Sequence, residues 1–238
     1  MGQAGSVELA PAKLTLRLRV TGLRDDGLHE LDAEMTTVDL YDELTFSAGD
    51  GLTVLGHEIP DDGQPNLVRR ALRLAGRRAH VTLNKRIPAG AGLGGGSADA
   101  AAALRWAGIT HLALAAQLGS DVPFCVRGGR ARVTGVGDVI EPLSFRPEVY
   151  TLLIPPIHVP TGEVYRMWDE LASTRTPGPN DLEPAALAVC PELAEWRDRL
   201  GNATGETPVL AGSGSTWFVR GAFAKAGIVV HATRPTGR

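Results

Sequence analysis

A glycine-rich segment is the part of the sequence best suited to bind a ligand through its backbone. It reads Pro88-Ala89-Gly90-Ala91-Gly92-Leu93-Gly94-Gly95-Gly96-Ser97-Ala98, and an alanine-rich stretch over 98–106 follows at once. Alanine favours helix, and serine is a common first residue of one, so we expect Ser97 to cap a helix here. The first turn of a helix carries unpaired N–H groups and the positive end of the helix dipole. The segment therefore predicts a phosphate-binding loop.

Other glycine motifs fit this segment less well. Gly90, Gly92 and Gly95 match the spacing of a dinucleotide-binding fingerprint. A Rossmann loop also requires an acidic residue about 20 positions later, where this chain has Thr110-His111-Leu112. A P-loop needs a lysine directly after its glycines, and protein kinases carry HRD and DFG triplets; the chain has neither. A flexible glycine hinge stays open as the simplest alternative.

Three further residues have the chemistry of phosphoryl transfer, which needs a metal, a positive charge and a group that orients the acceptor hydroxyl. Ser97 offers a hydroxyl to a metal ion or a phosphate, Lys13 supplies the charge, and Asp121 supplies a carboxylate. Considered alone, Lys13 and Asp121 are each more typical of a charged residue on the solvated surface. Asp99, one turn into the expected helix, either favours the helix dipole or faces Mg²⁺.

Composition limits the class of partner. The chain of 238 residues has a formal net charge of −3, so it lacks the positive field that attracts nucleic acid or an anionic membrane. No stretch reaches the roughly 18 apolar residues of a membrane span, and the first residues do not form a signal peptide. Cys125 and Cys190 lack metal-ligand spacing. We expect a cytoplasmic enzyme with a small-molecule substrate and neither a nucleic-acid nor a membrane partner.

Periodicity predicts both strands and helices. Stretches in which apolar and polar residues alternate predict strands, and stretches with apolar residues three or four positions apart predict helices. Two prolines after residue 154 suggest a domain boundary nearby, which divides the chain into 1–146 and 147–238. The predicted strands cover 14–20, 33–46 with a turn at 42–43, 80–85, 130–140 and 150–154, and the predicted helices cover 67–75, 111–118, 161–173 and 191–200.

Five motifs in a fixed order carry a family resemblance. They are Ala10-Pro11-Ala12-Lys13-Leu14-Thr15-Leu16, Asp25-Asp26-Gly27-Leu28-His29-Glu30-Leu31, the loop over 88–98, Leu118-Gly119-Ser120-Asp121-Val122-Pro123-Phe124, and Gly212-Ser213-Gly214-Ser215-Thr216. Segments 160–165 and 180–184 extend the resemblance to almost the whole chain. Together they closely resemble the 4-diphosphocytidyl-2-C-methyl-D-erythritol kinases, a family of the GHMP kinase superfamily.

The resemblance implies a fold and a reaction. The fold is α+β, a two-lobed GHMP kinase fold with a ribosomal protein S5 domain 2-like N-terminal lobe and a shortened, ferredoxin-like C-terminal lobe. The family uses ATP and Mg²⁺ to phosphorylate the 2-hydroxyl of 4-diphosphocytidyl-2-C-methyl-D-erythritol in non-mevalonate isoprenoid (terpenoid) biosynthesis. We expect a monomer or a homodimer, and the sequence does not decide between them.

The resemblance also implies roles for individual residues. Asp121 accepts the hydroxyl proton, and Lys13 orients Asp121 or stabilises the developing charge. Loop 88–98 holds the ATP phosphates, and Ser97 is the candidate Mg²⁺ contact. The remaining ligands are Asn66 and Lys85 for the nucleotide and, for the substrate, Thr15, His29 reading the cytosine edge, Tyr165 stacking on its face, and Gly212, Ser213, Gly214 and Ser215 around its phosphates.

Some positions depart from the family pattern. Leu28 replaces a usual tyrosine, which removes one aromatic wall of the cytosine site, and stacking on a base is worth roughly 1–3 kcal/mol. Thr15 replaces a usual asparagine. The chain is also shorter between Trp106 and Leu112 and near its C-terminus. A GHMP kinase for another polyol or small alcohol, and a nucleotide-binding homologue without catalysis, therefore stay open as alternatives.

Overall fold

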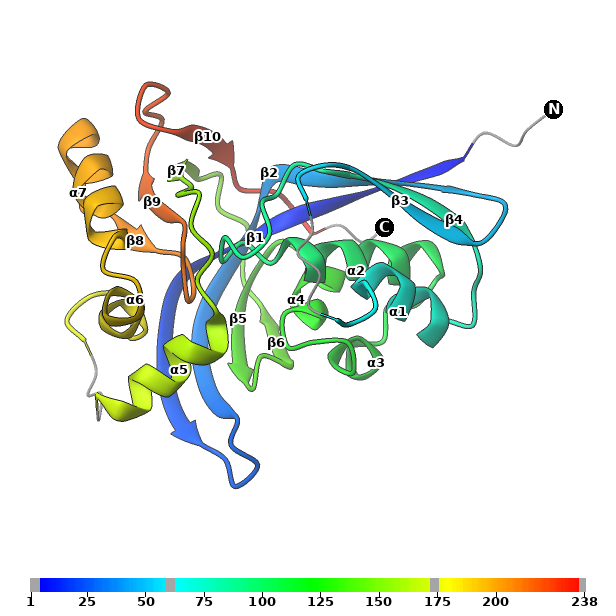
Figure 1. The fold of residues 1–238 in the computed structure, drawn as a ribbon, viewed down its shortest axis with the longest axis horizontal. Helices are drawn as coiled ribbons and strands as arrows, with labels where there is room; N and C mark the ends of the chain where they lie inside the picture. Colours follow the sequence, from blue (N-terminus) through cyan, green and yellow to red (C-terminus); the bar gives the residue numbers. More distant parts are fainter. Residues whose placement is uncertain (1–4, 59–62, 172–175, 236–238) are drawn as a thin grey trace.

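Two β-sheets with helices packed against each make up the protein, which we describe from a computed structural model covering residues 5–58, 63–171 and 176–235. The sheets lie side by side, joined through the long strands at the start of the chain (Figure 1). The mixture of helices and sheets confirms the predicted α+β class. Within the described residues, no helix combines the length and hydrophobicity needed to cross a bilayer.

The first sheet has six strands and is organised around a long antiparallel hairpin. The two hairpin strands pair along almost their whole length, and the second pairs on its other edge with two further strands. The strand order is β3-β4-β2-β5-β6, with β1 on the free edge of β2. The bounds are β1 (Ser6–Leu23), β2 (His29–Ser47), β3 (Gly51–Gly56), β4 (His80–Lys85), β5 (Arg130–Gly135) and β6 (Val139–Pro142).

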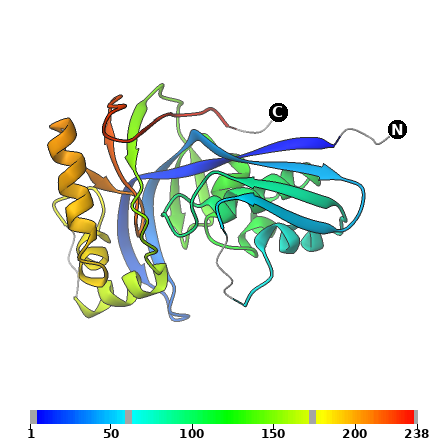
Figure 2. The same ribbon diagram turned by 45° about the horizontal axis from the view of Figure 1, so that its top comes forward.

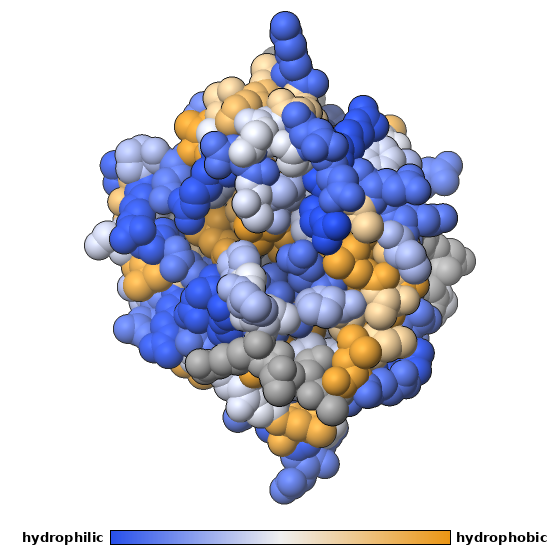
Figure 3. Space-filling view, turned by 90° about the vertical axis from the view of Figure 1, so that its left-hand side faces the viewer, coloured by the Kyte–Doolittle hydropathy of each residue, from blue (hydrophilic) through white to orange (hydrophobic). Residues whose placement is uncertain are grey.

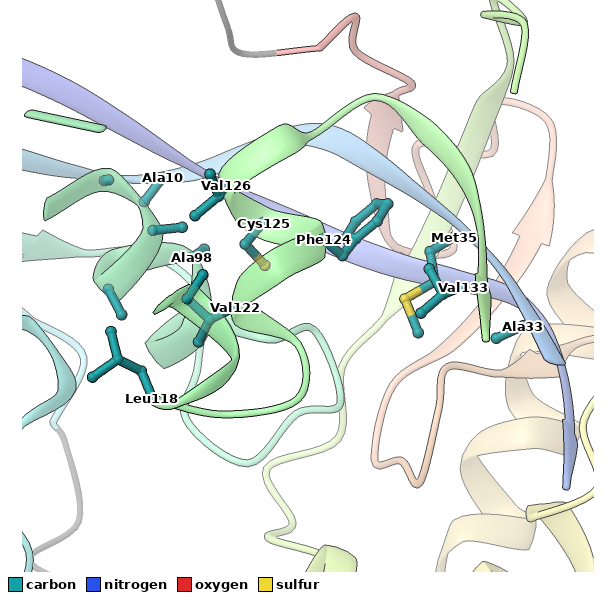
Figure 4. Close-up of a cluster of buried hydrophobic side chains, with 14 of the residues drawn as sticks. Ala10, Ala33, Met35, Ala98, Leu118, Val122, Phe124, Cys125, Val126 and Val133 are labelled. Atoms are coloured by element: carbon teal, nitrogen blue, oxygen red, sulfur yellow. The ribbon is translucent and has the colours of Figure 1, made fainter. Parts of the chain in front are cut away.

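Four helices cover one face of this sheet, as Figure 2 shows most clearly. The central one, α2, is rich in alanine, and its residues from Ala100 to Ala103 are fully buried. Such small side chains let the helix approach the sheet closely. Figure 4 shows Val122, Cys125 and Val126 of α4 beside Ala98 of α2, with Phe124 directed toward Met35 and Val133 of the sheet. The bounds are α1 (Leu67–Leu74), α2 (Gly95–Trp106), α3 (Leu112–Ala116) and α4 (Val122–Arg127).

The second sheet has four strands in the order β10-β7-β9-β8, flanked by three helices. Those helices form the face seen in Figure 3, where hydrophobic patches lie between hydrophilic side chains. The strands change from the first sheet to the second between Pro142 and Val149; the division at 146/147 stays a prediction. The bounds are β7 (Val149–Leu153), β8 (Val209–Leu210), β9 (Trp217–Arg220), β10 (Ile228–His231), α5 (Thr161–Glu170), α6 (Glu183–Val189) and α7 (Leu193–Thr204).

Three local predictions were wrong. No turn interrupts the chain at Asp42, because β2 continues through it, paired with Ala10 of β1. Ser97 does not cap α2, because Gly94 precedes the helix at a φ of 65° and Ser97 is its third residue. The predicted strand 130–140 is two strands, since Asp138 accepts a hydrogen bond from Val136 N in the turn between them. The end of the predicted helix 161–173 lies partly outside the described residues.

Candidate active site

Lys13 and Asp121 form an ion pair between the two glycine-rich segments. Lys13 lies on β1 and Asp121 immediately precedes α4, and Lys13 Nζ is 3.3 Å from Asp121 Oδ2. The lysine side chain is 8% exposed and the aspartate 31%, so the carboxylate is the solvent-facing partner. Lys13 Nζ also donates to Thr15 Oγ1 at 3.3 Å. Thr15 is buried, so its hydroxyl holds the ammonium from the interior of the protein.

The glycine loop 88–94 reaches the lysine through its backbone. The pairing of β1 with β2 shifts register just before Lys13, and the lysine N–H donates to the carbonyl of Leu93 at 3.0 Å. A Cβ on Gly94 would stand 2.7 Å from Lys13 Cγ, so any larger residue there would force the lysine side chain or the loop to shift. The loop then opens onto the N-terminus of α2 at Gly95. Lys13 therefore lies directly beside the predicted phosphate site.

The second glycine segment, 211–215, packs against the first. A Cβ on Gly92 would come within 2.4 Å of the Ala211 carbonyl oxygen and 2.6 Å of that of Gly214. Thr216 closes the contact, because its hydroxyl donates to the Ala91 carbonyl at 2.6 Å. The buried Asn180 holds the segment from the other side through its amide N–H groups, which donate to the carbonyls of Leu210 and Gly212 at 2.9 and 2.7 Å.

Two cavities that share part of their walls lie near the ion pair. The smaller, about 120 Å³, has Lys13 and Asp121 in its wall together with Thr161, Gly212 and Ser213. The larger, about 650 Å³, extends outward past His29 to α5. Leu31, Ser120, Val136 and Tyr165 line both, so the two cavities are neighbours between the catalytic candidates and the tip of the β1–β2 hairpin.

His29 and Tyr165 meet in this larger space. Their rings stack with centroids 4.8 Å apart, and Trp168 approaches the His29 ring edge-on at 5.6 Å. His29 Nε2 lies 2.8 Å from Asp169 Oδ1 on α5. Burial raises the pKa of Tyr165, with a smaller contribution from the negative charge of Asp121. The tyrosine is therefore a neutral hydroxyl close to the candidate base.

Lys85 occupies a different place from the other predicted ligands. It is 4% exposed and its ammonium lies 2.5 Å from Asp42 Oδ2 and 2.8 Å from Asp99 Oδ2, beneath the glycine loop. Burial raises the pKa of Asp99 to about 7, against the opposing charge of Lys85. Asn66 caps α1, where its side-chain oxygen accepts from Val68 N at 2.8 Å.

The structure thus brings some predicted residues together and separates others. Lys13, Asp121, Tyr165, Gly212 and Ser213 share the smaller cavity. Of the predicted phosphate-binding segment 88–98, Ala91 and Leu93 of the loop and Gly95 and Ala98 of α2 are buried, whereas Ser97 is half-buried on the first turn of α2. Thr15 and Lys85 lie behind the site, His29 lines the larger cavity, and Gly214 and Ser215 pack against the glycine loop and Pro155.

Sequence reasoning missed several residues that shape the site. Asp42 was assigned to a turn, although it stands in alternation with the buried Leu44 and Phe46, a spacing that signals an inward-facing charge. Asn180 and Thr216 carried no assigned role. Asp169 gave no signal, because only the packing of α5 against the hairpin brings it to His29.

Comparison with known proteins relates the whole chain to one group of enzymes. Residues 66–129 match the family model of the GHMP kinases N terminal domain. The chain is 39% identical to 4-diphosphocytidyl-2-C-methyl-D-erythritol kinase of Paracoccus denitrificans, with 92% of this chain and 87% of the relative covered. It is 40% identical to the enzyme of that name from Pelotomaculum thermopropionicum, with coverages of 88% and 87%.

Comparison with solved structures leads to the same family as the comparison of sequences. A crystal structure of 4-(cytidine 5'-diphospho)-2C-methyl-D-erythritol kinase superposes with a TM-score of 0.76 at 34% identity, covering 95% of this chain and 98% of that one. A homoserine kinase from Cytophaga hutchinsonii superposes with a TM-score of 0.63 at 17% identity, over 98% and 96% of the two chains. The second likeness concerns the fold alone.

Proposed function

Because the chain belongs to the 4-diphosphocytidyl-2-C-methyl-D-erythritol kinase family of the GHMP kinases, we propose that it transfers a phosphoryl group from ATP to that substrate. The acceptor is its 2-hydroxyl, in the formation of isoprenoid precursors. The observation that carries the proposal is the ion pair of Lys13 and Asp121, which stands at the point where the two glycine segments and the smaller cavity meet.

Asp121 is the general base of the proposed reaction. Its carboxylate faces the smaller cavity, where a hydroxyl can approach to hydrogen-bond distance and give up its proton as the phosphoryl group arrives. Lys13 fixes the orientation of the carboxylate and places positive charge beside the transferring group. Thr15 holds the lysine from behind at 3.3 Å. The pair therefore supplies both the proton acceptor and the electrostatic stabilisation.

The glycine loop and the start of α2 bind the triphosphate. Backbone N–H groups at a helix N-terminus together with the helix dipole favour anions, and Lys13 lies against Gly94 at this end. Among the described residues, no cluster of three or more His, Cys, Asp or Glu is arranged to hold a metal. Mg²⁺ suits a site where phosphates supply most ligands; we assign it to the nucleotide phosphates and the Ser97 hydroxyl, where it would neutralise their charge.

The larger cavity accommodates the cytidine end of the acceptor. Its wall holds His29, which we assign to the cytosine edge, and Tyr165, which we assign to the ring face. Leu28 lines the same cavity, so one wall is aliphatic where the family usually has an aromatic ring. The net charge of −3 supports a small-molecule acceptor rather than nucleic acid. The cytoplasmic setting and the monomeric or homodimeric state remain predictions.

Coupled ADP release with Mg-ATP and 4-diphosphocytidyl-2-C-methyl-D-erythritol tests the function. We expect turnover by the natural chain and a fall in kcat of roughly 10²–10⁴-fold in Asp121→Asn, the usual contribution of a general base. The matched control is Asp198→Asn, an exposed aspartate on α7 whose partner is Arg197. It should retain full activity.

Two results would count against the proposal. Undiminished turnover by Asp121→Asn would remove the assigned base. Turnover with another polyol but not with the cytidine substrate, together with no competition by CMP, would replace the acceptor and keep the kinase. CMP competition against the acceptor, measured at saturating ATP, discriminates these cases because CMP carries the cytosine assigned to the larger cavity.

A further inference from the structure

A buried cluster of three charges lies beneath the glycine loop, apart from the cavities that hold the substrate. Lys85 ends β4, Asp42 lies on β2, and Asp99 lies in the second turn of α2. Their side chains are 3%, 0% and 3% exposed, and the lysine ammonium contacts one oxygen of each carboxylate, at 2.5 and 2.8 Å. The ammonium is thus enclosed between two acids.

The two carboxylates belong to opposite ends of the loop. Asp42 Oδ1 accepts hydrogen bonds from the backbone N–H groups of Arg86 and Ile87 at 2.5 and 2.8 Å, just before the loop begins at Pro88. Asp99 belongs to the helix that starts where the loop ends, at Gly95. Lys85 therefore ties the entry of the loop to its exit across the base.

The fit around the lysine is close. A Cβ on Gly95 would stand 3.0 Å from Lys85 Nζ and 3.0 Å from Ile87 Cγ2, so the start of α2 rests directly on the ammonium and on the end of the entry segment. A shift in any of these groups moves the first turn of α2. That turn carries the N–H groups that face the phosphates.

Stability alone does not explain the cluster. Removing charges from water is costly, and a buried ion pair is often no more stabilising than apolar residues of the same volume. Here the carboxylates of Asp42 and Asp99 share the single ammonium of Lys85. In addition, Asp99 Oδ1 is buried without a hydrogen-bond partner among the described residues. The arrangement is better explained by the geometry that it imposes on the loop.

We propose that Lys85, Asp42 and Asp99 form a charge clasp that holds both ends of the glycine loop at the spacing that binds the nucleotide triphosphate. All three are positioning residues, and Lys85 acts from beneath the loop instead of contacting the nucleotide. This inference rests on the proposed function of the loop as the ATP site.

The sharpest variant is Asp99→Asn, because it leaves Lys85 paired with Asp42 and removes the surplus buried acid. A purely structural role predicts a change in melting temperature, whereas the clasp predicts a change in the loop. We expect the Kd for ATP, measured by calorimetry, to rise at least 10-fold, with the melting temperature maintained. The KM for ATP should rise in step while the KM for the acceptor stays the same.

Asp42→Asn is the second variant, and Asp32→Asn is its control on the same strand. Asp32 pairs with Arg17 and Arg132, far along β2 from the loop, so its loss should leave ATP binding unchanged. Hydrogen exchange at the amides of residues 89–95 should quicken in Asp42→Asn and Asp99→Asn but not in the control.

The outcomes separate the clasp from the proposed function. Unchanged Kd and unchanged exchange in both variants would overturn the clasp. A uniform loss of ATP affinity, acceptor affinity and melting temperature would also overturn it, since that pattern is general damage. If the natural chain does not bind ATP, the proposed function fails, and the exchange of residues 89–95 still decides whether the clasp orders the loop.

Discussion

Gly92→Ala tests whether the contact between the two glycine segments sets the geometry of the site. Gly92 has a φ of 75°, and an added Cβ would stand 2.4 and 2.6 Å from the carbonyl oxygens of Ala211 and Gly214. The matched control is Gly76→Ala, at a φ of 61°, where no described heavy atom beyond the adjacent residues lies within 4 Å of the added Cβ. Both variants carry the left-handed backbone cost of about 1–2 kcal/mol. Only Gly92→Ala also forces the segments apart.

The size of that displacement follows from the contact distances. Ordinary contacts of a Cβ begin at 3.4 Å, so the segments must separate by about 1 Å, a misplacement that can cost about 100-fold in rate. We expect kcat/KM in the coupled assay to fall by about that factor in Gly92→Ala and to change less than 3-fold in Gly76→Ala. The measurement should be made well below both melting temperatures, which the backbone cost lowers by roughly 2–8 °C. Equal activity of the two variants would refute the reasoning, because it would mean that the contact does not position the reacting groups.

Two further predictions concern buried and exposed polar contacts of the site. Asn180→Ala removes the side-chain donor to the carbonyls of Leu210 and Gly212. A buried polar group left unsatisfied costs about 1–3 kcal/mol, so we expect the unfolding free energy from denaturant titration to fall by roughly 2–4 kcal/mol. A loss below about 0.5 kcal/mol would contradict this prediction. Asp169→Ala frees the His29 ring. Asp169 is 43% exposed, so the contact is worth about 0.2–1 kcal/mol, and we expect CMP to bind up to about 5-fold more weakly by calorimetry. Unchanged CMP affinity would show that the carboxylate does not orient the ring.

The arrangement of the glycine loop and the helix after it was largely predictable from sequence. The glycine loop and the alanine helix adjoin in the chain, so composition was enough to place α2 after the loop. The capping residue was not predictable in the same way, because Gly94 reaches a φ of 65° that serine adopts only with strain. Helix signals thus located the element but misplaced its first residue.

Contacts between distant segments were beyond the sequence patterns. Lys85 ends a correctly predicted strand, but its two partners lie 43 and 14 positions away, so no local spacing shows that it points beneath the loop. The same holds for His29 and Asp169, which are 140 positions apart. Family resemblance assigns His29 to the cytosine edge, which stays a prediction, and its partners depend on how α5 packs against the hairpin.

Different parts of the fold hold the ion pair and the wall of the larger cavity, so the proposed function places catalysis and acceptor recognition on separate supports. The ion pair of Lys13 and Asp121 is supported by the glycine segments, and these are joined to each other by Thr216 and by the close approach at Gly92. Leu28 instead lies at the hairpin tip, 51% exposed, and lines only the larger cavity. Under the proposed function, a substitution at the tip changes the wall assigned to the cytosine without moving Lys13 or Asp121. We therefore expect Leu28 to affect which acceptor binds, and the ion pair to affect whether transfer occurs.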